Sequence, residues 1–288
     1  MADSIQQGML KASVNGFYTI QHSRIKIGNA IVSNFKTKLG QEPGKAEDEL
    51  DSEAKLLLNN LRATYKKITD GVVSMTPRKF KAEGLISNFS EYTLIQQYID
   101  LINSEDSAFK RLAYAVKEFP IYTQFLEDVK GVGPTMAAVI ISGFDIHKAE
   151  YPSSLHKYAG LDVINGAGRS RKKEHLIDQT YKDADGKEQT KKGITFNPFL
   201  KTKLIGVLGS SFVKTDGPYR KVYDNYKHRI ENMPAHAEKT KGHRNNMAIR
   251  YTVKRFLIDL YAAWRKLEGL PVAEEYSKAK LGINHKVA

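Results

Sequence analysis

A glycine-rich stretch, VKGVGPTMAAVIIS at residues 129–142, carries the first chemical pattern in the sequence. Gly131 and Gly133 can adopt backbone angles that other residues avoid, and Pro134 suits the first turn of a helix. The pattern therefore predicts a helix, a tight glycine hairpin and a second, apolar helix. Backbone N–H groups at such a hairpin can bind one phosphate without reading a base. The alternatives are a purely structural corner and a nucleotide-binding loop, although no Lys-Ser or Lys-Thr pair closes a P-loop here.

The second chemical pattern is the sequence NGAGRSRKK at residues 165–173. It places the hydroxyl of Ser170 between two arginines, so the hydroxyl is expected near a phosphate. There it could attack the phosphorus as a nucleophile, or it could only hydrogen-bond to a phosphate or to solvent, which is the simpler interpretation. The residues expected to contact nucleic acid lie in these two patterns and further along the chain. They are Lys130, Gly131, Val132, Gly133, Thr135, Arg169, Arg171, Lys172, Lys173, Lys201, Lys203, Arg220 and Lys221.

The distribution of charge supports a polyanionic partner for the second half of the chain. The 288 residues carry a formal net charge of +13. Residues 1–128 hold 16 Lys and Arg against 16 Asp and Glu, whereas residues 129–288 hold 29 against 16. All of the excess positive charge therefore follows the glycine hairpin, which favours nucleic acid as the partner. No amphipathic basic helix stands out as a membrane anchor, so no membrane partner is expected.

The sequence contains no convincing metal site. There are no cysteines, and His228, His236 and His243 lack the spacing with carboxylates that zinc sites use. A group of acids at residues 47–53 lies on an expected helix, where it is typical of a solvated first turn. No cofactor is therefore expected, and Mg²⁺ is expected only if the protein is catalytically active.

Hydrophobic spacing predicts a mainly α fold in which a helical arm precedes a helix-hairpin-helix domain. The expected divisions are an N-terminal helical segment at 1–45, a helical arm or coiled coil at 46–124, the helix-hairpin-helix domain at 125–270 and a tail at 271–288. Helices are expected from Ser90 to about Asn103, over residues 107–119 with Pro120 at the end, over 198–212 and over 245–267. Residues 175–197 are expected to form a small irregular or β-hairpin insert, with Asp185-Gly186 at the turn.

These pieces together resemble a known domain. From about residue 125 to 269, the chain resembles the C-terminal domain of the insertion-sequence one-ten transposases, also called the one-sixteen or nine-oh-two group. The resemblance rests on the glycine hairpin KGVGPTMA, on KYAGL at 157–161, on PFLKTKLIGVLGSSF, on GPYRKVYDNYKHRI and on the final segment KGHRNNMAIRYTVKRFLIDLYAAWRKLEG. The order and spacing of all five pieces agree with that domain.

The resemblance implies a DNA strand-transfer enzyme with parts that this chain does not match. The family's N-terminal RuvC-like domain supplies four metal-binding acids, its C-terminal domain supplies an attacking serine, and a structured RNA guides target choice. The first 45 residues here are too few for a RuvC-like fold. Ala167-Gly168 occupies the place of the family's Ser-Gly, and Ser170 lies three residues further on.

We therefore expect a transposase-related DNA-binding protein that recognises branched or distorted DNA through the hairpin and the basic loop. One alternative is an active recombinase with Ser170 as the nucleophile. The other is an oligomeric module for RNA or protein interaction, associating through residues 46–124. The N-terminus lacks the pattern of a signal peptide, so a cytoplasmic location is expected, at the nucleoid if the protein is bacterial or phage-encoded.

Overall fold

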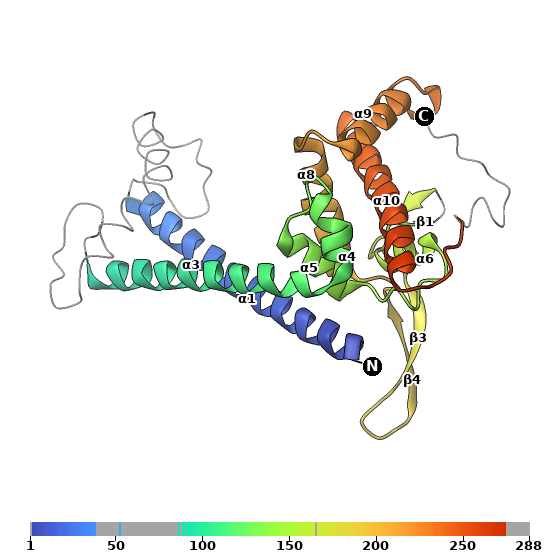
Figure 1. The fold of residues 1–288 in the computed structure, drawn as a ribbon. Helices are drawn as coiled ribbons and strands as arrows, with labels where there is room; N and C mark the ends of the chain where they lie inside the picture. Colours follow the sequence, from blue (N-terminus) through green and yellow to red (C-terminus); the bar gives the residue numbers. More distant parts are fainter. Residues whose placement is uncertain (1, 39–51, 53–85, 87, 165, 275–288) are drawn as a thin grey trace. The chain divides into compact units, whose positions relative to one another are not determined.

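The longest helix of the second half, α10, runs from Lys241 to Leu267 and supplies the largest share of the core around it (Figure 1). The computed structural model describes residues 2–38, 52, 86, 88–164 and 166–274. Their secondary structure is mostly helical with two small antiparallel hairpins, so the predicted mainly α fold with a β-hairpin insert is confirmed. The expected helix after Ala46 lies outside the described residues apart from residue 52, and so does most of the tail.

The chain divides into two compact units. One comprises Ala12–Arg111, and the other comprises Met1–Lys11 together with Leu112–Ala288. The first is built mainly from parts of α1 (Ala2–Lys38) and α3 (Phe89–Ala115). Within it, Glu105 accepts hydrogen bonds from Arg24 and from the Nε2 of Gln21, the latter at 2.9 Å. These bonds join the two helices across a small core.

Helix α3 is one continuous helix, which corrects the prediction of two helices over 90–103 and 107–119. The polar residues between the predicted helices include no glycine or proline, so nothing there interrupts the backbone hydrogen bonds. A 3-10 turn, Val116–Glu118, follows α3. Pro120 then begins a new helix, α4 (Pro120–Gln124), instead of only ending the previous one.

Proline begins most of the shorter helices in the second unit. It stands in the first turn of α5 (Pro134–Gly143), α6 (Pro152–Tyr158), α7 (Pro198–Thr202) and α9 (Pro218–Glu231) as well as α4. At this position the missing N–H removes no helical hydrogen bond, and the fixed φ angle already suits the helix. A π-helical segment, Lys203–Leu208, joins α7 to α8 (Gly209–Lys214), so the predicted helix over 198–212 is present but wider in its middle.

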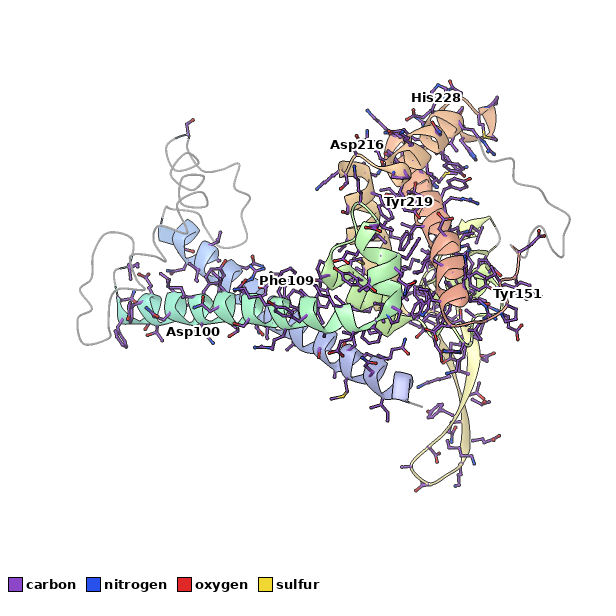
Figure 2. The ribbon with its side chains drawn as sticks, in the orientation of Figure 1. Asp100, Phe109, Tyr151, Asp216, Tyr219 and His228 are labelled. Atoms are coloured by element: carbon purple, nitrogen blue, oxygen red, sulfur yellow. The ribbon has the colours of Figure 1, made fainter. Side chains whose placement is uncertain are left out.

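Helix α10 begins four residues before the predicted start at Asn245, because Thr240 caps it. The Thr240 hydroxyl accepts the backbone N–H of His243 at 3.2 Å. The predicted apolar stripe is buried from Ile249 to Trp264, while Leu267 is 36% exposed. Within this stripe the ring of Phe256 packs edge-to-face against Phe212 of α8 and against Tyr219 of α9. Tyr219 is labelled in Figure 2.

The predicted hairpin is formed by β3 (Ile177–Lys182) and β4 (Glu188–Gly193), which pair antiparallel over six residues each. The carboxylate of Asp183 accepts the backbone N–H groups of Asp185 and Lys187, and Gly186 has a φ of +77°. These features explain the turn at the predicted Asp185-Gly186. A shorter hairpin pairs β1 (Val163–Ile164) with β2 (Ala167–Gly168). None of the described helices combines the length and hydrophobicity needed to cross a bilayer.

Candidate functional site

The glycine hairpin is a tight turn between two helical segments, as the sequence predicts. Helix α4 and a 3-10 turn, Leu126–Asp128, precede it. The backbone N–H of Val132 donates to the carbonyl of Val129 at 2.9 Å, and Gly131, the third residue of the turn, has a φ of +100°. This is the geometry of a type II turn, in which the third position strongly favours glycine.

The two glycines of the hairpin have different roles. A Cβ on Gly131 would lie 3.0 Å from the ring of Phe212, and the Ser211 hydroxyl donates to the Gly131 carbonyl at 2.8 Å. Gly133 has an ordinary φ of −89°, and a Cβ there would meet nothing within 4 Å. Gly131 is therefore required by the turn and by packing, whereas Gly133 keeps the space above the backbone open.

Helix α5 presents its N-terminus and buries its body. Gly133 is its N-cap, Pro134 follows, and no side chain caps the first turn. The six residues from Met136 to Ile141 are all buried. Of the residues predicted to contact nucleic acid here, Lys130 is exposed, Thr135 is half-buried and Val132 is buried at 9% exposure. The first-turn N–H groups therefore remain available as donors to an anion.

A second helix N-terminus lies against the hairpin. Helix α9 begins with Gly217-Pro218, again without a side-chain cap. A Cβ on Gly217 would lie 3.2 Å from the Cβ of Lys130, so the two segments are in contact. Arg220 and Lys221 follow in the first turn, but Arg220 forms an ion pair with Asp224 at 2.7 Å. This places the positive ends of two helices and the exposed Lys130 beside each other.

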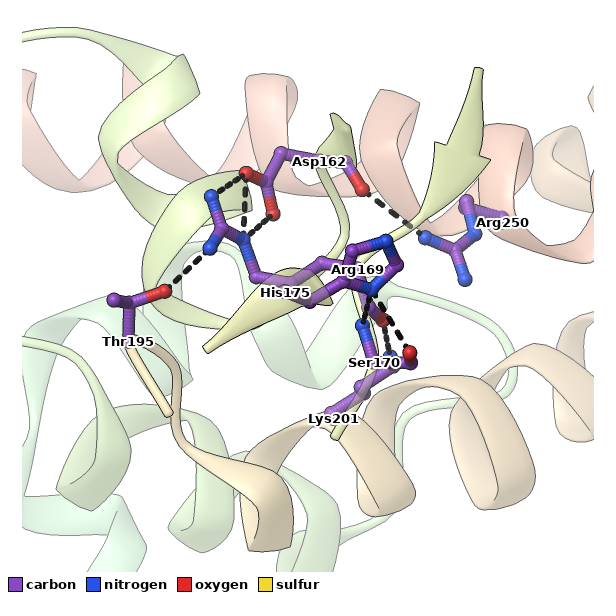
Figure 3. Close-up of polar contacts among 7 residues, drawn as sticks. All are labelled: Asp162, Arg169, Ser170, His175, Thr195, Lys201 and Arg250. Atoms are coloured by element: carbon purple, nitrogen blue, oxygen red, sulfur yellow. Dashed lines mark hydrogen bonds and ion pairs between the residues drawn. The ribbon is translucent and has the colours of Figure 1, made fainter. Parts of the chain in front are cut away.

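The basic loop differs from its predicted form because Arg169 is buried. Its guanidinium makes three hydrogen bonds of 2.6–2.8 Å to the carboxylate of Asp162 and another to Thr195 at 2.6 Å (Figure 3). The bond to Asp162 raises the pKa of Arg169 further. Arg169 therefore holds the loop together and does not offer its guanidinium to solvent. Three other residues of the loop that were predicted to contact nucleic acid are exposed: Arg171, Lys172 and Lys173.

Lys201 lies beside this loop, and Lys203 follows Lys201 two positions later in the sequence. The Nζ of Lys201 donates to the carbonyl of Arg169 and lies 4.9 Å from the ring centroid of Phe196. Burial and the neighbouring Arg250 lower the pKa of Lys201. Lys203 stacks over Phe199 at 5.4 Å, and burial lowers its pKa.

Ser170 contacts a buried histidine that the sequence analysis did not consider. Its Oγ lies 2.8 Å from Nδ1 of His175, and its backbone N–H donates to the same nitrogen at 2.9 Å. Nδ1 must therefore be an acceptor, which places the ring hydrogen of neutral His175 on Nε2. The Ser170 Oγ also accepts the N–H of Lys172 at 3.3 Å. The only signal in the sequence was the spacing of five residues between a serine and a histidine.

Two cations of α10 also lie near this loop, and the sequence analysis did not single them out. A Cβ on Gly168 would lie 2.6 Å from Nη2 of Arg250, and Arg250 donates to the carbonyl of Asp162 at 3.4 Å. Lys254, one helical turn further on, has a pKa lowered by burial and by Arg250. Their i, i+4 spacing places both on one helix face, which was the available signal.

His156 of α6 is the titratable group most affected by this environment. Its Nε2 lies 3.2 Å from the carbonyl of Lys254 and must donate to it. Burial, followed by the charge of Lys254, lowers the pKa of His156 from 6.5 to about 4. The imidazole is therefore neutral at physiological pH.

Within the described residues, no group of three or more His, Cys, Asp and Glu side chains could hold a metal ion. No protein-family model, curated protein or solved structure matches the chain. The functional interpretation therefore depends on the geometry of the hairpin and of the loop around Ser170.

The two glycines provide a matched test of the hairpin geometry. We expect Gly131→Ser to lower the free energy of unfolding by more than about 1 kcal/mol, because a side chain is strained at this positive φ and meets Phe212. Gly133→Ser should leave stability unchanged or raise it slightly, because serine is a good N-cap. Urea denaturation measures both. Equal losses in the two variants would contradict the assigned turn.

The low pKa of His156 predicts acid sensitivity. The unfolded chain binds a proton on this residue near pH 6.5 and the folded chain only near pH 4, so the neutral ring contributes stability that is present above pH 6.5. As the pH falls from 6.5 to 4, this contribution of up to about 3 kcal/mol should be lost. His156→Gln keeps a donor for the Lys254 carbonyl but does not titrate. Urea denaturation at several pH values should show a shallower decline for this variant, and parallel curves would refute the assignment.

Proposed function

We propose that the chain is a transposase-related nucleic-acid-binding protein that contacts DNA phosphates through the glycine hairpin. The observation that carries the proposal is the uncapped N-terminus of α5, which follows a type II turn and has open space above Gly133. Backbone N–H groups in this arrangement can donate hydrogen bonds to the oxygens of one phosphate. The resemblance to the transposase domain supports DNA as the partner.

The surroundings of the hairpin fit a phosphate better than a neutral ligand. The N-terminus of α9 and the side chain of Lys130 add positive potential beside α5. Lys221 and the exposed cations at 171–173 add further positive charge on the same unit. Contacts of this kind fix a protein on the nucleic-acid backbone but do not read the base sequence. Recognition by shape, as in branched or distorted DNA, is consistent with such contacts.

The decisive experiment places a carboxylate at Gly133. Aspartate there caps α5 with the same N–H groups that we assign to the phosphate, so the fold should keep its stability while DNA is repelled. We expect Gly133→Asp to weaken binding at least tenfold in fluorescence anisotropy. The slope of log affinity against log salt should fall by about one, corresponding to one lost phosphate contact.

The control for this experiment is Gly16→Asp, because Gly16 is exposed on a helix of the other unit and has no neighbour within 4 Å. It adds the same charge and should bind like the wild type. Four-way junction DNA, linear duplex and structured RNA serve as parallel ligands. Wild-type affinity of Gly133→Asp for all three would remove the hairpin from the proposed function.

The contact between Ser170 and His175 favours a second candidate, a strand-transfer activity with Ser170 as the nucleophile. His175 could accept the hydroxyl proton while Oγ forms a bond to phosphorus, and the bond from phosphorus to a sugar oxygen would break. The departing oxygen takes a proton and leaves as a hydroxyl, so the step is a balanced transesterification. A structural role competes with this one, because the same two residues close the loop through Ser170 N–H and Lys172 N–H.

A covalent adduct separates these two roles. If Ser170 is the nucleophile, denaturing gels of wild-type protein with labelled junction or nicked DNA and Mg²⁺ should show a protein-linked DNA band. Ser170→Ala should abolish the band, whereas Ser210→Ala should retain it as the matched control. Complete absence of the band with wild-type protein on all of these DNA substrates would leave DNA binding without this chemistry.

A further inference from the structure

The loop around Asp162 brings together more positive than negative charge. Arg169, Lys201, Arg250 and Lys254 come from the loop, from α7 and from α10, and three of them are drawn with Asp162 in Figure 3. Lys201 contacts the loop through the Arg169 carbonyl, and Arg250 contacts it through the Asp162 carbonyl. These contacts place Lys201 and Arg250 at one short segment of backbone, and Lys254 lies one helical turn beyond Arg250 on α10.

The single carboxylate of Asp162 balances only part of this charge, and its direct hydrogen-bonding partner is Arg169. Oδ1 accepts from Nε of Arg169 at 2.8 Å, and Oδ2 accepts from Nε at 2.8 Å and from Nη2 at 2.6 Å. The salt bridges among the described residues include no carboxylate partner for Lys201, Arg250 or Lys254. Three cations in this region therefore have no acid of their own, although the charge of Asp162 acts on each of them.

The partial burial of these three cations makes the imbalance costly. Burial lowers the pKa of Lys201, Arg250 and Lys254, and Arg250 lowers those of both lysines further. Moving charges of one sign out of water and close together is unfavourable unless an anion compensates them. An arrangement that serves only stability would favour neutral side chains at these positions.

The backbone at Gly168 determines where the guanidinium of Arg250 lies. Gly168 has no side chain where the guanidinium lies, since a Cβ there would be 2.6–2.7 Å from three of its atoms. The glycine therefore permits Arg250 to lie directly against the loop, with its orientation fixed by the Asp162 carbonyl. A planar guanidinium held in this way matches the geometry of phosphate oxygens.

We propose that Lys201, Arg250 and Lys254 form a second phosphate-binding site for a nucleic-acid backbone, built on α7 and α10 and not on the glycine hairpin. The identity of the ligand as nucleic acid rests on the proposed function. The site supplies charged side chains, whereas the hairpin supplies backbone N–H groups. Occupation by a phosphodiester neutralises the cation cluster and removes the repulsion between its members.

The test uses Lys254→Met in the full chain, with Lys266→Met as the matched control. Lys266 lies on the same helix and is exposed, so its loss removes the same charge without affecting the cluster. We expect Lys254→Met to weaken DNA binding five- to tenfold and to lower the salt slope by about one. Lys254→Arg keeps the charge and should retain most of the affinity. Lys266→Met should bind like the wild type.

A second measurement separates the site from the proposed function. Inorganic phosphate should raise the melting temperature of the wild type above that in chloride of equal ionic strength. Lys254→Met should lose the part of this increase that the cations supply, whereas Gly133→Asp should lose only the part that the hairpin supplies. An unchanged phosphate response and unchanged DNA affinity in Lys254→Met would overturn the site, even if Gly133→Asp abolishes DNA binding. If the wild type binds no DNA, the proposed function fails, and the phosphate response alone decides whether the cations form an anion site.

Discussion

The ion pair between Arg169 and Asp162 is the interaction on which the loop around Ser170 and the cations beside it depend. It is bidentate, largely buried and extended by the bond from Arg169 to Thr195, which follows β4. The pair therefore fixes both ends of the segment that carries Ser170 and the β3–β4 hairpin. Removing one partner of such a pair typically costs about 3–5 kcal/mol, because the other charge remains buried and unpaired. The same carboxylate also acts on the cations of α7 and α10, but one negative charge does not balance all of them.

The glycine hairpin depends on packing and not on ion pairing. Its turn is held by the hydroxyl of Ser211 and by the ring of Phe212, and that ring packs against Tyr219 and Phe256. A chain of contacts thus connects the turn to the core helix α10. Because the turn is held in place by the core, its N–H groups need little further ordering when an anion binds. Preorganisation of this kind improves affinity without adding contacts.

Local sequence signals predicted those parts that depend on neighbouring residues. The glycine hairpin, the turn at Asp185-Gly186 and the apolar stripe of α10 each follow from spacing within a few residues, and the structure contains all three. The prediction divided α3 into two helices, although the polar residues between them do not end a helix. Pro120 was taken for a helix end, although the first turn is where proline fits best.

The composition of the cation cluster could not be predicted from local signals. The contact between Asp162 and Arg250 joins residues 88 positions apart, and the burial of Arg169 depends on Thr195, 26 positions away. A run of basic residues such as GRSRKK indicates an exposed loop unless a distant partner is known. The contact of Ser170 with His175 is local, but a spacing of five residues in a loop does not determine whether two side chains meet.

The two proposed contacts also constrain what the protein can recognise. In the proposed function, backbone N–H groups at the hairpin and cations on α7 and α10 both contact phosphates, and phosphates carry no direct information about base sequence. Together they account for affinity and for position on the nucleic acid. Any choice of sequence must therefore come from contacts with base edges elsewhere, from the shape of the nucleic acid, or from pairing with a structured RNA, which the family resemblance implies. Shape is the property that two separate phosphate sites can measure by themselves, because both are satisfied only when the backbone presents phosphates at matching positions.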